Sequence, residues 1–246
     1  MFKTQIGLIS TIDRLKLPAK QLSQVLTIIE REFDSAVITV TNTTNPSVLA
    51  LIQETTVNSF SVPRNGAANG RRLAVSKFVE VSRLSDSSLI LHIDFDKLAT
   101  MIIRKPDAFH QLIMKTRLGI SFDYACVNRS SENMQTYPKA WTDTETCTNK
   151  CAQAFFELSD FTDFTSGAAI IRQKFLSFIS EASDAKMIDA EWPLIVKRHN
   201  GQIGSVETAG LPFTQLNREV TQKPLWQRYA DRIRLVQQII EPLTQE

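Results

Sequence analysis

Ser88-Leu89-Ile90-Leu91-His92-Ile93-Asp94-Phe95-Asp96 is a nearly continuous apolar run that ends in two carboxylates separated by one residue. A run of this length without polar alternation predicts a strand over 88–93 that is buried on both faces of a sheet. Asp94-Phe95-Asp96 then stands at the carboxyl end of that strand. Strand alternation stops there, so the two carboxylates can lie on the same side of the chain.

Three strand-then-helix units precede this segment. The expected elements are, in chain order, a strand over 5–10, a helix over 18–33, a strand over 36–40, a short helix that starts at 45–46, a strand over 59–62 and a helix over 71–84. Strands that alternate with helices of this length pair in parallel and have helices on both faces of the sheet. We therefore expect a three-layer α/β fold with a mostly parallel central sheet.

The second half of the chain has a more mixed pattern. Its expected elements are a strand over 120–128, a helix over 141–156, a helix over 167–179, a strand over 203–208 and an amphipathic helix over 224–240. The sequence contains no internal repeat and no linker that would divide it, so we expect a single domain over 1–246.

The composition is that of an ordinary globular chain. Of the 246 residues, 43% are hydrophobic and 22% are charged, and a net charge of +2 is too small for a dedicated nucleic-acid surface. We expect no secretory signal, because the charged segment 13–16 follows the first apolar stretch and no small-residue cleavage site appears. We expect no membrane span, because no apolar run approaches about 18 residues. Cys126, Cys147 and Cys151 are too few for a disulfide framework and no histidine lies beside them, so we expect a cytoplasmic protein without a zinc site.

The carboxyl ends of the strands are where a sheet of this kind binds ligands. Four segments meet there in the predicted topology, namely 10–13, 41–45, 64–72 and 94–96. Asp94 and Asp96 supply hard oxygen ligands, and Mg²⁺ or Mn²⁺ is usually held by one or two carboxylates together with substrate phosphates. A cation there would neutralise a departing diphosphate. The alternative is that one of the two carboxylates only caps the following helix.

The first hundred residues resemble, remotely, the family-2-like GT-A glycosyltransferases, which use nucleotide-diphosphate sugars. The resemblance rests on the strand–helix units, on the loop Asn65-Gly66-Ala67-Ala68-Asn69-Gly70-Arg71-Arg72, and on the strand that ends in Asp-x-Asp. In that family the loop often contains Ala-Arg-Asn, whereas here the arginines follow the glycine. The resemblance implies a GT-A-like nucleotide-diphospho-sugar transferase fold, with a nucleotide-binding half over 1–100, an acceptor-side half over 101–213 and a C-terminal helical extension over 214–246.

The resemblance also implies roles for residues at the strand ends. Asp96 would be the main ligand of Mn²⁺ or Mg²⁺, and Asp94 would contact the metal or the ribose. Arg71 or Arg72 would bind the diphosphate, since an arginine fork suits phosphate oxygens, and the alternative is a solvated helix surface. The residues placed at the nucleotide base and ribose by position are Ser10, Thr11, Asp13 and Asn42.

Two later segments are candidates for contacts with the acceptor and the donor sugar. In inverting relatives a late carboxylate deprotonates the acceptor hydroxyl, so Asp189 is the first catalytic candidate and Glu191 the second. The alternative is that Asp189 only caps a helix. Backbone N–H groups before Gly167 would hold a sugar hydroxyl or a phosphate, unless Thr165 or Ser166 simply caps a helix there. His92 is expected in the core and His199 at the surface.

Other enzyme classes lack their motifs here. The chain has no Gly-x-x-x-x-Gly-Lys-Ser/Thr loop, no Gly-x-Gly-x-x-Gly fingerprint and no Gly-x-Ser-x-Gly turn. The sequence therefore predicts a metal-dependent glycosyltransferase with a nucleotide-diphosphate sugar donor and an unidentified acceptor, no nucleic-acid partner, and a homodimer contact through the C-terminal helix as an option. Two alternatives stay open. One is a non-catalytic relative that binds a nucleotide or a protein, and the other is a sugar nucleotidyltransferase, which usually has a glycine-rich loop with a basic residue after the first strand.

Overall fold

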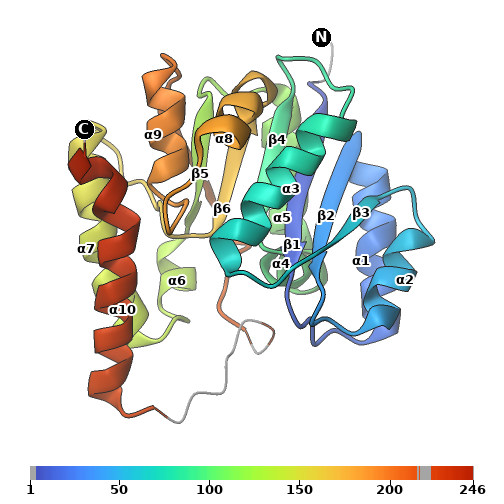
Figure 1. Ribbon diagram of the computed structural model, residues 1–246, viewed down its shortest axis with the longest axis horizontal. Coiled ribbons are helices and arrows are strands. Elements are labelled where there is room, and N and C mark those ends of the chain that lie inside the picture. The colour runs from blue at the N-terminus through green and yellow to red at the C-terminus, as the bar shows by residue number, and fades with distance from the viewer. Residues whose placement is uncertain (1–3, 215, 217–222, 246) are drawn as a thin grey trace.

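The computed structural model describes residues 4–214, 216 and 223–245, which contain one seven-stranded sheet (Figure 1). The strand order is β3-β2-β1-β4-β6-β5-β7. The strands are β1 (Ile6–Ile12), β2 (Ser35–Thr41), β3 (Asn58–Val62), β4 (Leu89–Ile93), β5 (Tyr124–Arg129), β6 (Ala168–Arg172) and β7 (Ile203–Thr208). Neighbouring strands pair in parallel except β6, which is antiparallel to both β4 and β5. The predicted mostly parallel sheet is therefore confirmed.

Helices cover both faces of the sheet and make three layers with it (Figure 1). The helices are α1 (Ala19–Glu32), α2 (Pro46–Gln53), α3 (Ala67–Val81), α4 (Phe95–Arg104), α5 (Pro106–Leu118), α6 (Ser131–Met134), α7 (Lys139–Phe155), α8 (Leu176–Ala182), α9 (Glu191–Arg198) and α10 (Leu225–Ile240). Helices α1, α2, α4 and α5 share one core with the sheet, whereas α3, α8 and α9 share the other. Helices α7 and α10 pack against each other at one side of the molecule. Within the described residues, no helix combines the length and the apolar character that a membrane crossing requires.

Strand β4 shows how the sequence builds the two cores. Leu89 and Ile93 point into the core with α1 and α4, whereas Ile90 points into the core with α3. The alternation follows because successive residues of a strand face opposite sides of the sheet. His92 lies on the second face, where its buried ring meets the Trp192 indole edge-on with 4.8 Å between ring centroids. The expectation that His92 is a core residue is confirmed.

Residues 5–93 follow the predicted order closely. Helix α5 was not predicted, and two predicted elements differ clearly from the structure. Helix α3 begins at Ala67 instead of Arg71, so the expected loop supplies its first turn. The helix predicted over 167–179 is wrong in its first part, because residues 168–172 form β6 and helical structure starts only at Gln173. A short apolar run fits a strand or a helix equally well by pattern, and pairing with β4 and β5 settles the outcome here.

The carboxyl ends of β1, β2 and β4 lie at the same edge of the sheet, at the lower side of Figure 1. Helix α4 follows β4 almost directly, so Asp94 precedes the first helical residue and Asp96 lies in the first turn. The Asp94 side chain makes no capping hydrogen bond to this helix. The carboxylate is therefore available for other partners at this edge.

Candidate functional site

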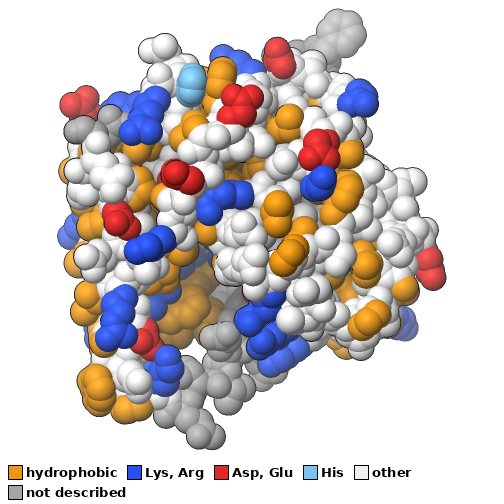
Figure 2. Space-filling model, viewed as in Figure 1, with side chains coloured by type: hydrophobic (Ala, Val, Ile, Leu, Met, Phe, Trp, Pro, Cys, Tyr) orange, Lys and Arg blue, Asp and Glu red, His pale blue; other side chains and the backbone are white. Residues whose placement is uncertain are grey.

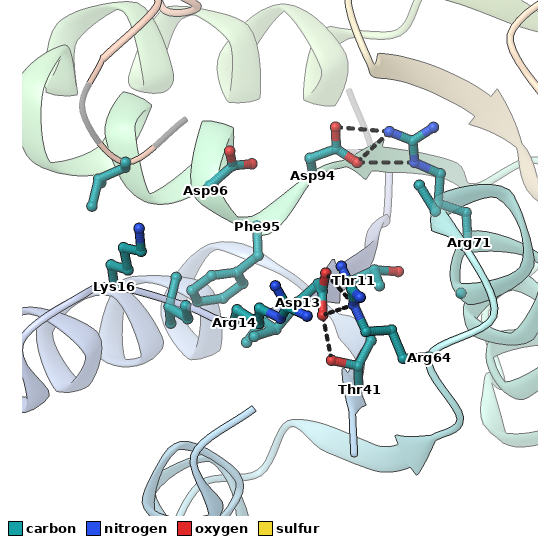
Figure 3. Close-up of a pocket in the computed structure, with 16 residues that line it drawn as sticks. Thr11, Asp13, Arg14, Lys16, Thr41, Arg64, Arg71, Asp94, Phe95 and Asp96 are labelled. Carbon is teal, nitrogen blue, oxygen red and sulfur yellow. Dashed lines mark hydrogen bonds and ion pairs between the residues drawn. The ribbon is translucent and has the colours of Figure 1, made fainter. Parts of the chain in front are cut away.

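A pocket of about 610 Å³ opens at the carboxyl edge of the sheet (Figure 3). Its walls come from the ends of β1, β2 and β4, from the loop after β3, from the first turn of α3 and from Leu216. The lining residues are Thr11, Ile12, Asp13, Arg14, Leu15, Lys16, Thr41, Arg64, Gly66, Ala67, Gly70, Arg71, Asp94, Phe95, Asp96 and Leu216. The four segments that the sequence placed around one crevice thus meet at one pocket.

Asp94 is held by the guanidinium group of Arg71 in the pocket wall (Figure 3). Arg71 Nε and Nη2 donate to Asp94 Oδ1 at 2.9 and 2.8 Å, and Nη2 also donates to Oδ2 at 2.9 Å. Burial alone would raise the pKa of Asp94, but the cations of Arg71 and Lys97 outweigh burial and hold the pKa well below its usual range. Asp94 is therefore ionised at any ordinary pH.

Lys97 provides a second cation for the same carboxylate. Its Nζ donates to Asp94 Oδ2 at 3.1 Å and to the Ser166 carbonyl oxygen at 2.8 Å. Gly167 makes room for this ammonium group, because a Cβ atom at position 167 would overlap Lys97 Nζ. The φ of Gly167 is +70°, a conformation that glycine adopts at no steric cost. The turn before β6 and the start of α4 are therefore joined through Lys97.

A second ion pair lies in the same pocket, between Asp13 and Arg64. Arg64 Nε donates to the two Asp13 oxygens at 3.1 and 3.0 Å, and Thr41 Oγ1 donates to Asp13 Oδ1 at 2.7 Å. Burial raises the pKa of Asp13, but the hydrogen bonds from Thr41 and Arg64 outweigh burial and lower it. Both charged side chains are 40% exposed, so the pair remains accessible to a ligand.

Arg14 and Lys16 add positive charge at the mouth of the pocket. Both are exposed, and within the described part of the chain neither makes an ion pair. Arg14 has a left-handed backbone with a φ of +51°, and its N–H donates to Thr44 Oγ1 at 3.0 Å. Figure 2 shows Lys and Arg side chains gathered at the lower edge of this face. A cleft with cations on its wall favours an anionic ligand.

The donor set at Asp94 and Asp96 does not fit the two-carboxylate metal site that the resemblance implies. Both Asp94 oxygens already accept hydrogen bonds from Arg71 and Lys97. Asp96 Oδ1 accepts the backbone N–H of Lys97 at 2.9 Å. Among the described residues, no three His, Cys, Asp or Glu side chains come together as a metal site. A divalent cation on Asp94 would have to displace two fixed cations.

Asp189 is half-buried and lies outside the pocket lining, within electrostatic reach of Arg71 and Asp94. Its Oδ2 has no hydrogen-bond partner among the described residues. Burial raises the pKa of Asp189, Arg71 lowers it in part, and Asp94 raises it again, so the net shift is upward. A carboxylate with a buried, unpaired oxygen and a raised pKa is typical of groups that exchange protons with a substrate.

Glu191 and Arg72 do not line the pocket, and they bind each other instead. Glu191 Oε1 accepts the backbone N–H groups of Asp184 and Ala185, each at 2.6 Å. Glu191 Oε2 accepts from Ser183 Oγ at 2.5 Å and from Arg72 Nη2 at 3.2 Å. Both carboxylate oxygens are thus engaged in holding the segment before α9. The roles expected for Glu191 in catalysis and for Arg72 at the diphosphate do not fit these positions.

The four residues expected at the nucleotide base and ribose separate into two groups. Thr11 and Asp13 line the pocket. Ser10 is fully buried, and its Oγ donates to the Ile93 carbonyl oxygen at 2.7 Å, which joins β1 to β4. Asn42 is exposed outside the pocket. His199 is exposed and stacks on Phe178, so the expectation that it lies at the surface is confirmed.

No protein-family model matches the sequence, and no curated protein matches it. Solved structures match over nearly the whole chain. Glucosyl-3-phosphoglycerate synthase from Mycobacterium tuberculosis in complex with uridine-diphosphate gives a TM-score of 0.62 at 11% identity and covers 98% of this chain and 80% of that chain. Its complex with Mn²⁺, uridine-diphosphate-glucose and phosphoglyceric acid gives 0.62 at 12% identity with the same coverage. The chain has the GT-A-like fold.

A 4-diphosphocytidyl-2C-methyl-D-erythritol synthase also matches, at 15% identity over 96% of this chain and 99% of that chain. Its TM-score is only 0.49. The GT-A-like fold therefore rests on the glucosyl-3-phosphoglycerate synthase structures and on the strand order. At identities of 11–15%, the similarity concerns the fold alone, and the reaction has to be inferred from the residues of the site.

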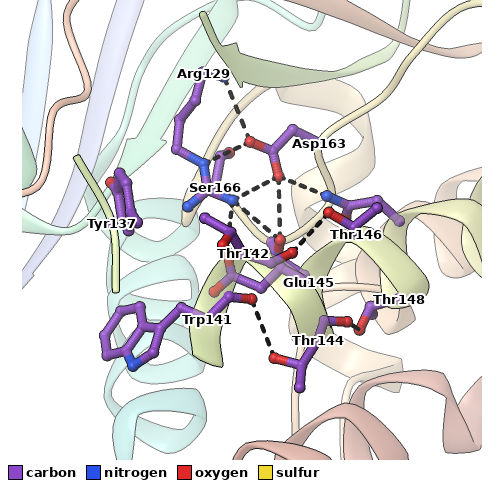
Figure 4. Close-up of polar contacts among 12 residues, drawn as sticks. Arg129, Tyr137, Trp141, Thr142, Thr144, Glu145, Thr146, Thr148, Asp163 and Ser166 are labelled. Carbon is purple, nitrogen blue, oxygen red and sulfur yellow. Dashed lines mark hydrogen bonds and ion pairs between the residues drawn. The ribbon is translucent and has the colours of Figure 1, made fainter. Parts of the chain in front are cut away.

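In the second half of the GT-A-like fold, a buried arginine anchors the turn before β6 (Figure 4). Arg129 Nε and Nη2 donate to Asp163 at 2.6 and 2.9 Å, and Nη2 donates to Glu145 at 2.8 Å. The Arg129 and Asp163 side chains are 1% and 0% exposed, so a partner for each charge is essential here. Asp163 begins the turn that ends at Gly167. The network therefore holds in place the residues 163–167, whose Ser166 carbonyl oxygen accepts from Lys97.

Sequence reasoning missed four cations around the site. Arg14 and Lys16 directly follow the first strand and Arg64 follows the third, so their places at strand ends were the available signal. Lys97 lies three residues after Asp94, a spacing at which two side chains meet on a helix. The approach of Ser166 to Lys97 has no signal in the sequence, because the two residues meet only through the strand pairing.

Proposed function

We propose that this protein is a glycosyltransferase that moves a sugar from a nucleotide-diphosphate donor to an acceptor hydroxyl. The observation that carries the proposal is the pocket of about 610 Å³, which combines a basic wall with carboxylates at the carboxyl edge of a GT-A-like sheet. Ligands of open α/β sheets bind at this edge. The glucosyl-3-phosphoglycerate synthase structures that share the fold contain uridine-diphosphate or its glucose conjugate, which supports a donor of the same chemical class.

The basic wall is the proposed site of the donor diphosphate. Arg14, Lys16 and Arg64 line it, and arginine forks match phosphate oxygens well. Asp13 beside Thr41 is 40% exposed and would accept hydrogen bonds from ribose hydroxyls. These residues belong to 1–100, which we propose as the nucleotide-binding half.

Asp189 is the proposed general base of an inverting transfer. The acceptor oxygen forms a bond to the anomeric carbon while the bond from that carbon to the diphosphate breaks. The diphosphate leaves with the electron pair, and Asp189 takes the acceptor proton. The buried, unpaired Oδ2 of Asp189 supports this role. Asp189 belongs to 101–213, which we propose as the acceptor-side half.

No step of this proposal passes through a metal ion. The expected Mn²⁺ or Mg²⁺ would neutralise the leaving diphosphate, but Asp94 is already paired with two cations. Neutralisation of the leaving diphosphate is assigned instead to the pocket cations Arg14, Lys16 and Arg64. Glu191 is left out of the reaction because both its oxygens hold the backbone and side chains before α9.

A sugar nucleotidyltransferase is the second candidate, and Arg14 and Lys16 favour it. Both residues follow β1 immediately and line the pocket. Enzymes of that class usually have a basic residue after the first strand, although the glycines that accompany it are missing here. The two candidates differ in the product that they release.

Product analysis separates the candidates. UDP-, GDP-, ADP- and dTDP-glucose are incubated with the wild type and with Asp189→Asn, and released nucleoside diphosphate is measured. We expect release from one donor, with water as the acceptor, and a decrease of about a hundredfold or more in the variant, the usual effect of losing a general base. In parallel, nucleoside triphosphates are incubated with sugar 1-phosphates. Pyrophosphate release in that set would replace the proposal with nucleotidyl transfer, and no release in either set would leave a nucleotide- or protein-binding relative.

A further inference from the structure

The carboxylate of Asp94 has no lone pair left for a metal ion. Oδ1 accepts from Arg71 Nε and Nη2 at 2.9 and 2.8 Å. Oδ2 accepts from Arg71 Nη2 at 2.9 Å and from Lys97 Nζ at 3.1 Å. A carboxylate offers about four lone-pair sites, and these four hydrogen bonds use them.

Lys97 is fixed in this position and is not a mobile surface lysine. Its side chain is 17% exposed, and its ammonium group also donates to the Ser166 carbonyl oxygen at 2.8 Å. Gly167 leaves the space that the ammonium group fills. A divalent cation bound to Asp94 would lie next to this fixed, half-buried charge, and like charges at such short range repel strongly.

The pocket supplies its own positive charge for a diphosphate. Arg14, Lys16 and Arg64 line it, and within the described residues the first two make no ion pair. Arg71 faces the same pocket and is neutralised by Asp94. The first carboxylate of the Asp-Phe-Asp segment is therefore already neutralised. The same pocket wall also carries cations that can face phosphate oxygens.

We propose that Lys97 and Arg71 take the place of the divalent cation at Asp94-Phe95-Asp96, and that a nucleoside diphosphate binds in this pocket without a metal ion. The inference rests on the proposed function for the identity of the ligand. Lys97 is then the residue whose removal would allow a divalent cation to bind beside Asp94.

Calorimetry on the full chain tests the inference with UDP, GDP, ADP and dTDP, each in EDTA and in MnCl₂. For the nucleotide that binds, the Kd in EDTA is expected to stay within about tenfold of the Kd with Mn²⁺, a difference of at most ~1.4 kcal/mol. A larger loss in EDTA overturns the inference and keeps the proposed function. Failure of all four nucleotides in both conditions contradicts the proposed function.

Lys97→Met tests the same point without depending on a nucleotide. Removal of the ammonium group leaves Arg71 Nη2 as the remaining donor to Asp94 Oδ2 and opens one lone pair of that oxygen. The variant is therefore expected to bind Mn²⁺ and to weaken the free-ion electron paramagnetic resonance signal, whereas the wild type leaves this signal unchanged. Lys115→Met, an exposed lysine on α5, is the matched control and is expected to behave like the wild type. A wild-type protein that binds Mn²⁺ as well as Lys97→Met does contradicts the inference.

Rescue completes the test. Nucleotide binding by Lys97→Met is expected to fall about tenfold or more in EDTA, equivalent to ~1.4 kcal/mol, and to return when Mn²⁺ is added. Loss without rescue, in a variant whose thermal unfolding shows that it is folded, would make Lys97 a structural residue and overturn the inference.

Discussion

A Cβ atom on Gly167 would lie 2.9 Å from Oδ2 of Asp94. The two residues come together because the turn before β6 runs beside the start of α4, where the Asp94 N–H donates to the Gly167 carbonyl oxygen at 3.4 Å. The position that a side chain would fill is occupied by Nζ of Lys97, which donates to Asp94 and to Ser166. The missing side chain at position 167 is therefore part of the charge arrangement around Asp94.

Gly167→Ala is expected to reduce both stability and nucleoside diphosphate binding. Residues forced into sparsely populated backbone conformations cost about 1–3 kcal/mol, and the new methyl group would also displace Lys97 from Asp94. Urea unfolding measures the first effect and calorimetry the second. Gly119→Ala is the control, because Gly119 also has a positive φ, of +94°, but its nearest neighbour would be Thr4 Oγ1 at 3.9 Å. Unchanged binding in both variants would contradict the role given to Gly167.

Arg71→Met is expected to destabilise the fold strongly. Arg71 and Asp94 side chains are 11% and 21% exposed, so the variant leaves a largely buried carboxylate with Lys97 as its remaining cation. Removal of one partner from a buried ion pair costs about 3–5 kcal/mol, and the surviving Lys97 contact points to the lower end of this range. The double variant Arg71→Met/Asp94→Asn is expected to regain part of the loss in urea unfolding. A double variant less stable than the single one would show that the ion pair is not the cause.

Acid is expected to destabilise the protein through His92. Burial, reinforced by the charge of Arg71, lowers the pKa of His92 from 6.5 to about 3. Because the unfolded chain takes up this proton first, the free energy of unfolding falls as the pH drops from 6.5 toward about 3, by about 1.4 kcal/mol per pH unit. His92→Phe keeps a ring beside Trp192 and is expected to lose less stability over this range. Parallel pH curves for the two proteins would contradict the assignment.

The sequence contained most of the information for residues 1–100, the proposed nucleotide-binding half. Strands β1, β2 and β4 are long apolar runs, so burial alone predicts them within one or two residues at each end. Strand β6 was not predictable in the same way. Ala168–Arg172 is short, and it becomes a strand only because β4 and β5 accept it between them.

The part of the candidate site that lies at the ends of strands was predictable from the sequence. Thr11, Asp13, Arg71 and Asp94 line the pocket as expected, because the carboxyl ends of parallel strands meet at one edge. Glu191 could not be separated from Asp189 by sequence, since both precede or begin the same helix. Their environments differ through contacts with Ser183–Ala185, which only the folded chain reveals.

Asp189→Asn is expected to remove catalysis and to stabilise the protein at neutral pH. Burial raises the pKa of Asp189 above 3.8, so ionisation favours the unfolded chain, and this penalty is present above the raised pKa and fades as the pH falls toward 3.8. Transfer is expected to fall about a hundredfold or more, as for the loss of a general base. Urea unfolding at several pH values and product release measure the two effects. Equal activity of variant and wild type would remove Asp189 from the reaction.

The basic pocket is proposed to bind the diphosphate of a nucleotide. Calorimetry with UDP, GDP, ADP and dTDP on wild type, Lys16→Glu and Lys20→Glu tests this claim. Lys16 lines the pocket, whereas Lys20 is exposed on α1 outside it, so the two variants change the net charge equally. A charged hydrogen bond to phosphate is worth about 1.5–3 kcal/mol, so Lys16→Glu is expected to weaken binding about 10- to 100-fold while Lys20→Glu stays close to the wild type. Equal weakening by both variants, or no binding of any nucleotide to the folded wild type, would contradict the claim.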